Sequence, residues 1–149
     1  MACFCYKGCG PIKIIDGRSS ANDYLQYLSD LVIPFAQEKY GQDFFLLHDN
    51  APIHRARSVQ SFLMQCLPGR VHRHPAYSPD LNPIEHIGNL TKAKIRKYLK
   101  VTNSSLTLED IVRSAWAEVA DNEVNIASLI DSMQDRYISC IDKLMYLRW

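Results

Sequence analysis

The feature that most constrains the fold is an apolar run that ends abruptly at a polar turn. Residues 43–48 (DFFLLH) are almost continuously apolar, and residues 49–52 (DNAP) follow directly. A short run of this composition, bounded by turn residues, is typical of a β-strand that is covered on both faces. The sequence therefore predicts a buried strand over residues 43–48, with Asp49 at its carboxyl end.

The segments on either side of this strand alternate between strand and helix patterns. Residues 2–7 and 12–15 predict a hairpin, with Gly8, Gly10 and Pro11 as the break between its strands. Residues 70–74 predict a further short strand. Helices are expected from Ser19–Ser20 to Gly41 with a kink at Pro34, between Pro52 and Leu67, after Pro83, after Thr107, and over about 124–145. The order β-β-α-β-α-β-α-α-α predicts an α/β fold in one domain over residues 1–149.

Composition and charge exclude several broad classes of protein. The 149 residues are 47% hydrophobic and 22% charged, which is close to the average for globular domains. The net charge of +1 gives no general attraction to nucleic acids or membranes. No apolar run approaches the roughly 18 residues that a membrane helix needs, so no membrane partner is expected. Five cysteines, an odd number, argue against a disulfide framework.

Two carboxylates are placed where they can carry chemistry. Asp49 ends the buried strand, and Glu85 lies in the first turn of the helix that Pro83 begins. Each also has a structural explanation, because aspartate favours turns and a carboxylate stabilises a helix N-terminus. Together they can hold a divalent cation, since Mg²⁺ takes one or two carboxylates with substrate phosphates and water. Two such ions about 4 Å apart can clamp the attacking and leaving oxygens of a phosphodiester.

Two local motifs make this pairing more specific. Residues 48–54 (HDNAPIH) and 78–86 (SPDLNPIEH) resemble the two signature blocks of the Tc/mariner-type DDE transposases. The 35 residues between Asp49 and Glu85 also suit that family. Residues 3–17 resemble its second and third strands, and residues 129–137 resemble its closing helix, so the resemblance covers nearly the whole chain.

The resemblance implies an RNase H-like mixed sheet flanked by helices and a metal-dependent DNA cut-and-paste activity. Three acidic residues bind the metal ions in this family; the second matches Asp49 and the third matches Glu85. The implied ion is Mg²⁺ or Mn²⁺, the implied partner is DNA, and the implied location is the nucleus.

The chain departs from the family pattern at its beginning. The first acidic residue of the family lies on a strand that precedes the hairpin, and here the hairpin begins at Ala2. We therefore expect a partial catalytic domain over residues 1–149, without the first, central strand and without the N-terminal helix-turn-helix region. The sheet is expected in two pieces with open edges, and the fragment or degenerate copy is expected to be inactive. Alternatively, Met1 is not the true start and the missing strand is encoded upstream.

A second departure lies at Gly88, where the family usually has tryptophan. Position 88 is expected to face inward from its helix. Truncating a core tryptophan to alanine typically costs about 3–5 kcal/mol, and glycine in a helix interior costs about 1 kcal/mol more. The sequence therefore predicts a weakened core at this point.

Basic residues near the two carboxylates allow a second interpretation of the chain beside that of an enzyme. Arg55 follows the Asp49 turn, and Lys92 and Arg96 lie on the helix after Glu85. These side chains either contact DNA phosphates or form a solvated helix face. The alternative to an enzyme is therefore a non-catalytic module that binds nucleic acid or assembles with a second copy or with a full-length transposase.

Overall fold

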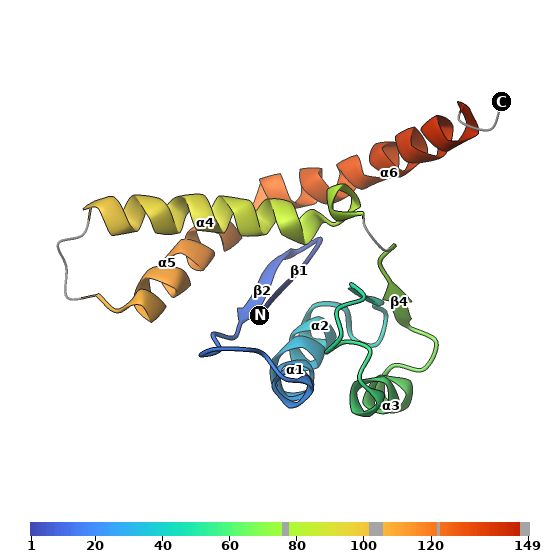
Figure 1. The fold of residues 1–149 in the computed structure, drawn as a ribbon, viewed down its shortest axis with the longest axis horizontal. Helices are drawn as coiled ribbons and strands as arrows, with labels where there is room; N and C mark the ends of the chain where they lie inside the picture. Colours follow the sequence, from blue (N-terminus) through green and yellow to red (C-terminus); the bar gives the residue numbers. More distant parts are fainter. Residues whose placement is uncertain (76–77, 102–105, 122, 147–149) are drawn as a thin grey trace. The chain divides into compact units, whose positions relative to one another are not determined.

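The computed structural model describes four stretches of the chain, namely residues 1–75, 78–101, 106–121 and 123–146. The chain divides into two units (Figure 1). The first unit consists of Met1–Cys3 and Gly10–Ser78, and the second of Phe4–Cys9 and Pro79–Trp149. No helix in the described stretches is long and apolar enough to span a membrane.

The predicted N-terminal hairpin is confirmed, but its second strand begins earlier than expected. Strand β1 spans Ala2–Cys5 and β2 spans Gly8–Ile12, so only Tyr6 and Lys7 form the turn. The prediction that the glycines and Pro11 interrupt the pairing was wrong. Gly8 has a φ of 120°, which suits a residue directly after a tight turn.

Gly10 lies within β2, at a place where close packing leaves no room for a side chain. A β-carbon built at Gly10 would lie 2.5 Å from Cys3 Sγ and 2.9 Å from a ring carbon of Phe35. Glycine in a strand interior often marks such a close approach. The same residue type therefore signals a break in one context and tight packing in another.

The first helical segment is interrupted before Pro34, as predicted. Helix α1 spans Ala21–Tyr27 and α2 spans Ile33–Tyr40, and one π turn over Leu28–Val32 joins them. Pro34 is the second residue of α2, so its missing N–H falls directly after the π turn. The expected helix stop is confirmed at Gly41, which has a φ of 61°.

The remaining strands form a second sheet, separate from the hairpin. The expected division of the sheet into two pieces is therefore confirmed for the described residues. Strand β3 (Leu46–His48) pairs in parallel with β4 (Val71–Arg73). The prediction that the strand is covered on both faces was wrong, because Phe45 is 61% and Leu47 51% exposed. Phe45, directly before β3, and Leu47 alternate along the chain as residues on one face of a strand do, and burial of that face requires neighbours that composition alone does not reveal.

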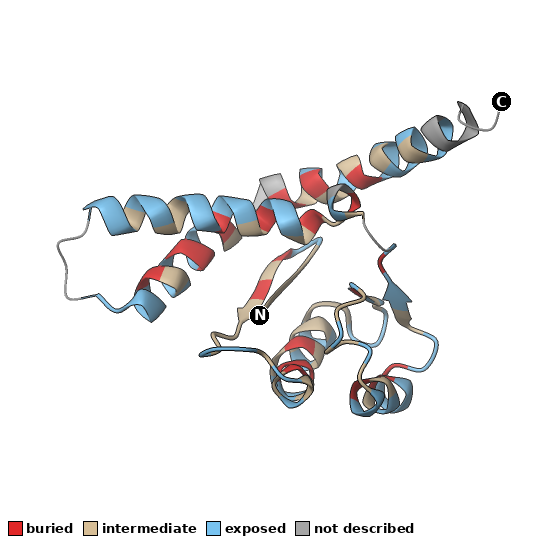
Figure 2. Cartoon of the chain, viewed as in Figure 1, coloured by how far each residue is buried: buried red, intermediate tan, exposed pale blue. Residues whose placement is uncertain are grey.

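The core of the first unit lies between α1, the π turn and helix α3 (Arg57–Cys66). Figure 2 shows buried residues on the sides of these helices that face one another. On α3, Val59 and Leu63 are buried, whereas Cys66 is exposed. The buried residues of this cluster are Tyr24, Tyr27, Leu28, Val32, Val59, Leu63 and Leu67.

Apart from the hairpin segment Phe4–Cys9, the described part of the second unit is helical. A short 3-10 turn (η2, Pro79–Leu81) precedes α4 (Pro83–Val101), and α5 (Leu108–Ala120) and α6 (Glu123–Tyr146) follow. Helix α4 packs along α5 and also contacts α6 (Figure 1). The predicted cap at Thr107 is confirmed as a reciprocal capping box with Asp110. Buried apolar residues on these elements include Leu81, Ile87, Ile111, Ala115, Trp116, Val119, Ile126, Leu129 and Met133.

Gly88 is half-buried on α4 and does not face a filled core position. Among the described residues, no atom other than those of the adjacent residues and the local helix backbone lies within 4 Å of the place that a β-carbon at Gly88 would take. Gly88→Ala is therefore expected to raise the free energy of unfolding by about 1 kcal/mol, because alanine is the better helix former. Urea unfolding followed by circular dichroism measures this gain. Gly10→Ala is the control, since the same change there creates a clash; a Gly88→Ala variant no more stable than the wild type would contradict the expectation.

Candidate active site

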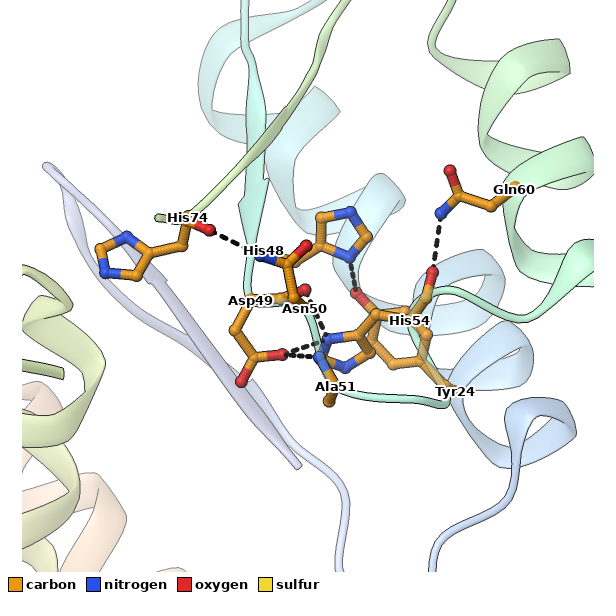
Figure 3. A network of polar contacts seen from close by, with 8 residues as sticks. All are labelled: Tyr24, His48, Asp49, Asn50, Ala51, His54, Gln60 and His74. Atoms are coloured by element: carbon orange, nitrogen blue, oxygen red, sulfur yellow. Dashed lines mark hydrogen bonds and ion pairs between the residues drawn. The ribbon is translucent and has the colours of Figure 1, made fainter. Parts of the chain in front are cut away.

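Asp49 lies directly after β3, at the carboxyl end of the parallel strand pair. Its side chain is 52% exposed, and the turn that follows the strand holds it (Figure 3). Oδ1 of Asp49 accepts a hydrogen bond from the Ala51 backbone N–H at 2.9 Å. The same oxygen lies 2.6 Å from Nδ1 of His54. The predicted turn at Asp49 is confirmed, and it presents a carboxylate to solvent.

Hydrogen bonds on both sides hold the turn itself in place. The His54 backbone N–H donates to the Ala51 carbonyl at 2.9 Å, which closes the turn. The Asn50 side chain donates to the His74 carbonyl at 2.9 Å, and that of Gln60 on α3 donates to the His54 carbonyl at 2.7 Å (Figure 3). The end of β4 and helix α3 therefore both fix the backbone that carries Asp49.

Beneath this turn lies a buried pair formed by Tyr24 and His48. The Tyr24 hydroxyl lies 3.3 Å from Nδ1 of His48. Burial raises the pKa of Tyr24, so its phenol keeps its proton. Burial, with smaller contributions from His54 and Arg73, lowers the pKa of His48 to about 4, and Asp49 opposes the shift. His48 is therefore neutral at pH 7, and its Nδ1 shares a hydrogen bond with the Tyr24 hydroxyl.

Two buried histidine nitrogens remain without a partner among the described residues. They are Nε2 of His48 and Nδ1 of His74. His74 uses its other nitrogen, which lies 2.8 Å from the Ser78 carbonyl. Sequence reasoning did not single out His48, His54 or Tyr24. The signal that was available is the pair of histidines that flank residues 49–53.

Glu85 lies in the first turn of α4, as predicted. Pro83 begins this helix, and Oδ1 of Asn82 accepts a hydrogen bond from the Ile84 N–H at 3.3 Å. The Glu85 side chain is exposed. The positive end of the helix dipole stabilises a carboxylate at this position.

Asp49 belongs to the first unit and Glu85 to the second. Among the described residues, no group of three or more His, Cys, Asp or Glu side chains is arranged to hold a metal ion. The two exposed carboxylates nevertheless suit such an ion chemically, because Mg²⁺ and Mn²⁺ prefer oxygen ligands.

The basic residues singled out in the sequence are all exposed. Arg55 follows the Asp49 turn, and Lys92 and Arg96 lie on α4. Their spacing of seven and eleven residues from Glu85 places Lys92 and Arg96 on the same side of the helix as that carboxylate. Lys94, on the opposite side of the helix, pairs with Glu118 of α5 instead. DNA contacts by the exposed residues remain a prediction.

Comparison with known proteins identifies the class to which this fold and these carboxylates belong. Residues 1–107 match the model of the DDE superfamily endonucleases, and the chain is a member of that family. The match contains both Asp49 and Glu85.

The chain is also similar to curated transposases and to a solved transposase catalytic domain. The chain is 28% identical to the Tc3 transposase of Caenorhabditis elegans over 87% of its own length and 39% of the relative's. It is also 28% identical to the Tc1 transposase of the same organism, over 94% of this chain and 50% of the relative. The chain thus spans half or less of the length of these two relatives. The catalytic domain of Mos1 transposase, solved with raltegravir and Mg, is similar with a TM-score of 0.73 and 24% identity; the match covers 93% of this chain and 70% of that one. The expected RNase H-like α/β fold is confirmed.

Proposed function

We propose that residues 1–149 supply the second and third metal-binding carboxylates of a Tc/mariner-type transposase catalytic domain. Asp49 and Glu85 are these two ligands, Mg²⁺ or Mn²⁺ is the ion, DNA is the substrate, and the nucleus is the expected location. The observation that carries the proposal is the exposed Asp49 carboxylate, held by its turn at the end of β3 in a chain of this family.

The proposed site residues have two roles, metal binding and contact with DNA phosphates. A bound divalent cation polarises the phosphodiester and lowers the pKa of an attacking water or hydroxyl. Asp49 and Glu85 hold the ion through their carboxylate oxygens. Arg55, Lys92 and Arg96 contact DNA phosphates, which favours binding without reading the base sequence.

A metal titration followed by nuclear magnetic resonance tests the two carboxylates directly. Mn²⁺ is expected to broaden the backbone amide signals of Ala51 and His86, each close in sequence to one ligand. Asp49→Asn and Glu85→Gln are each expected to remove broadening at both places if the two carboxylates share an ion. Asp43→Asn, at an exposed aspartate of the first unit, is the control. Broadening that persists in both ligand variants would refute the proposal.

The 149 residues by themselves are proposed to be unable to cut DNA. They carry two of the three acidic ligands that the resemblance assigns, and two-metal chemistry depends on the complete set. Incubation with supercoiled plasmid and Mg²⁺ or Mn²⁺ is expected to leave the plasmid intact. Metal-dependent nicking by the wild type that disappears in Asp49→Ala would show that this expectation is wrong and that the site is complete.

A second candidate function is that of a non-catalytic module that binds DNA or assembles with another chain. The exposed cations on α4 favour DNA binding. In the described part of the chain both sheets have only two strands, and their outer edges favour assembly. DNA binding that weakens with salt and survives the Asp49→Ala/Glu85→Ala double change would support it. Replacing Lys92 and Arg96 with alanine is then expected to reduce the slope of log affinity against log salt by about 2. Sedimentation in the presence and absence of a full-length transposase would reveal assembly.

A further inference from the structure

We propose that His54 is a positioning residue for Asp49. Its imidazole holds one carboxylate oxygen so that the other stays open toward a divalent cation. This inference rests on the proposed function, because it describes how one of the two metal ligands is oriented.

The contacts of the His54 ring determine where its proton lies. Nδ1 is 2.6 Å from Oδ1 of Asp49 and 3.3 Å from the Asp49 backbone carbonyl. A carboxylate and a carbonyl oxygen can only accept, so Nδ1 must carry the proton and donate it. The His54 tautomer is therefore fixed by Asp49 through two acceptors of the same residue.

The two oxygens of the Asp49 carboxylate have different surroundings. Oδ1 receives the Ala51 N–H at 2.9 Å as well as the His54 N–H. For Oδ2, the described residues offer neither a hydrogen bond nor an ion pair. Figure 3 shows the carboxylate turned with one oxygen toward His54 and Ala51 and the other away from them. This division leaves one oxygen for a ligand from outside.

The His54 ring is itself held, which makes it suited to orient a partner. Its side chain is only 17% exposed, whereas that of Asp49 is 52% exposed. The ring centroid lies 4.1 Å from that of Tyr24 and 5.2 Å from that of His48. Packing on these two rings removes the freedom of the imidazole during folding. Because His54 already holds the exposed Asp49 carboxylate in one orientation, binding of an ion costs little additional side-chain entropy.

Removing the imidazole leaves Asp49 with the Ala51 N–H alone. An exposed carboxylate with one remaining donor samples more rotamers, and only some of them present Oδ2 outward. Loss of a residue that orients a metal ligand typically weakens metal binding 10- to 100-fold. We expect His54→Ala to weaken Mn²⁺ binding about tenfold, the lower end of this range, because the Ala51 contact remains.

The experiment compares three His54 variants in the Mn²⁺ titration that monitors the Ala51 amide. His54→Asn keeps an N–H donor near the position of Nδ1 and is expected to restore most of the affinity. His54→Gln moves its donor toward the position of Nε2 and is expected to bind as weakly as His54→Ala. His72→Ala removes an exposed histidine on β4 and is the matched control. Thermal unfolding of each variant in EDTA separates a change in stability from a change in affinity.

The outcomes distinguish this inference from the proposed function. If Asp49→Asn leaves the broadening at Ala51 unchanged, Asp49 is not a metal ligand and the proposed function fails. If Asp49→Asn removes the broadening but His54→Ala binds Mn²⁺ like the wild type, the positioning role alone is overturned. Should His54→Ala not fold, the comparison of His54→Asn with His54→Gln decides, and equal affinities of these two variants would overturn the inference.

Discussion

Replacing Leu28 by alanine is expected to lower the free energy of unfolding of the first unit by about 3 kcal/mol. Leu28 is 1% exposed and belongs to the cluster that joins α1, the π turn and α3. The change removes three carbon atoms from a packed position, and the surrounding residues refill such a space only in part. Because domains are stable by only about 5–15 kcal/mol, this loss takes a large share of the total.

Native-state hydrogen exchange measures this loss where it occurs. The amides of α1 and α3 are expected to exchange faster in Leu28→Ala, whereas those of α5 report on the second unit separately. Leu47→Ala is the matched control, because it makes the same chemical change at a side chain that is 51% exposed. Its effect is expected to stay within about 0.5 kcal/mol. Equal effects of the two variants would mean that the cluster does not stabilise the first unit.

Acidification from pH 6.5 to pH 4 is expected to destabilise the first unit through His48. In the unfolded chain this imidazole has its ordinary pKa of 6.5, and burial lowers the folded-state pKa to about 4. The unfolded state therefore binds the proton more readily between these values, and protonation favours unfolding. The stability is complete above pH 6.5 and is lost as the pH falls toward 4. The pKa difference corresponds to at most about 3 kcal/mol.

Urea unfolding at a series of pH values, in EDTA, measures this dependence. His48→Gln keeps a polar side chain near Tyr24 but does not titrate, so its stability is expected to fall less steeply between pH 6.5 and 4. His72→Gln removes an exposed histidine and is expected to follow the wild-type slope. A His48→Gln slope equal to that of the wild type would show that burial of His48 does not drive the pH dependence.

Features set by neighbouring residues along the chain were predictable from the sequence. Thr107 and Asp110 form the expected capping box, Pro83 begins α4 and Gly41 ends α2. Each of these depends on local backbone chemistry within one turn. The position of Asp49 after a strand was predictable for the same reason.

Features set by distant residues were not predictable in this way. Gly10 was interpreted as a break because its fit against Phe35 depends on packing between segments far apart in the chain. Leu47 has the composition of a buried residue but lies on an uncovered face of β3. The bond between His54 and Asp49 depends on how the turn folds back on itself, which residue types alone do not specify.

The assignment of Phe4–Cys9 to the second unit has a consequence for how the protein is made. The Tyr6 hydroxyl donates to Asp131, a residue 125 positions later in the chain. A ribosome adds about 5–20 residues per second, so about 6–25 seconds pass between the synthesis of Tyr6 and that of Asp131. The first unit can assemble during that time, because its last residue is Ser78. The segment Phe4–Cys9 is thus translated before the first unit is complete, but its contact with the second unit through Tyr6 forms only after Asp131 has been made.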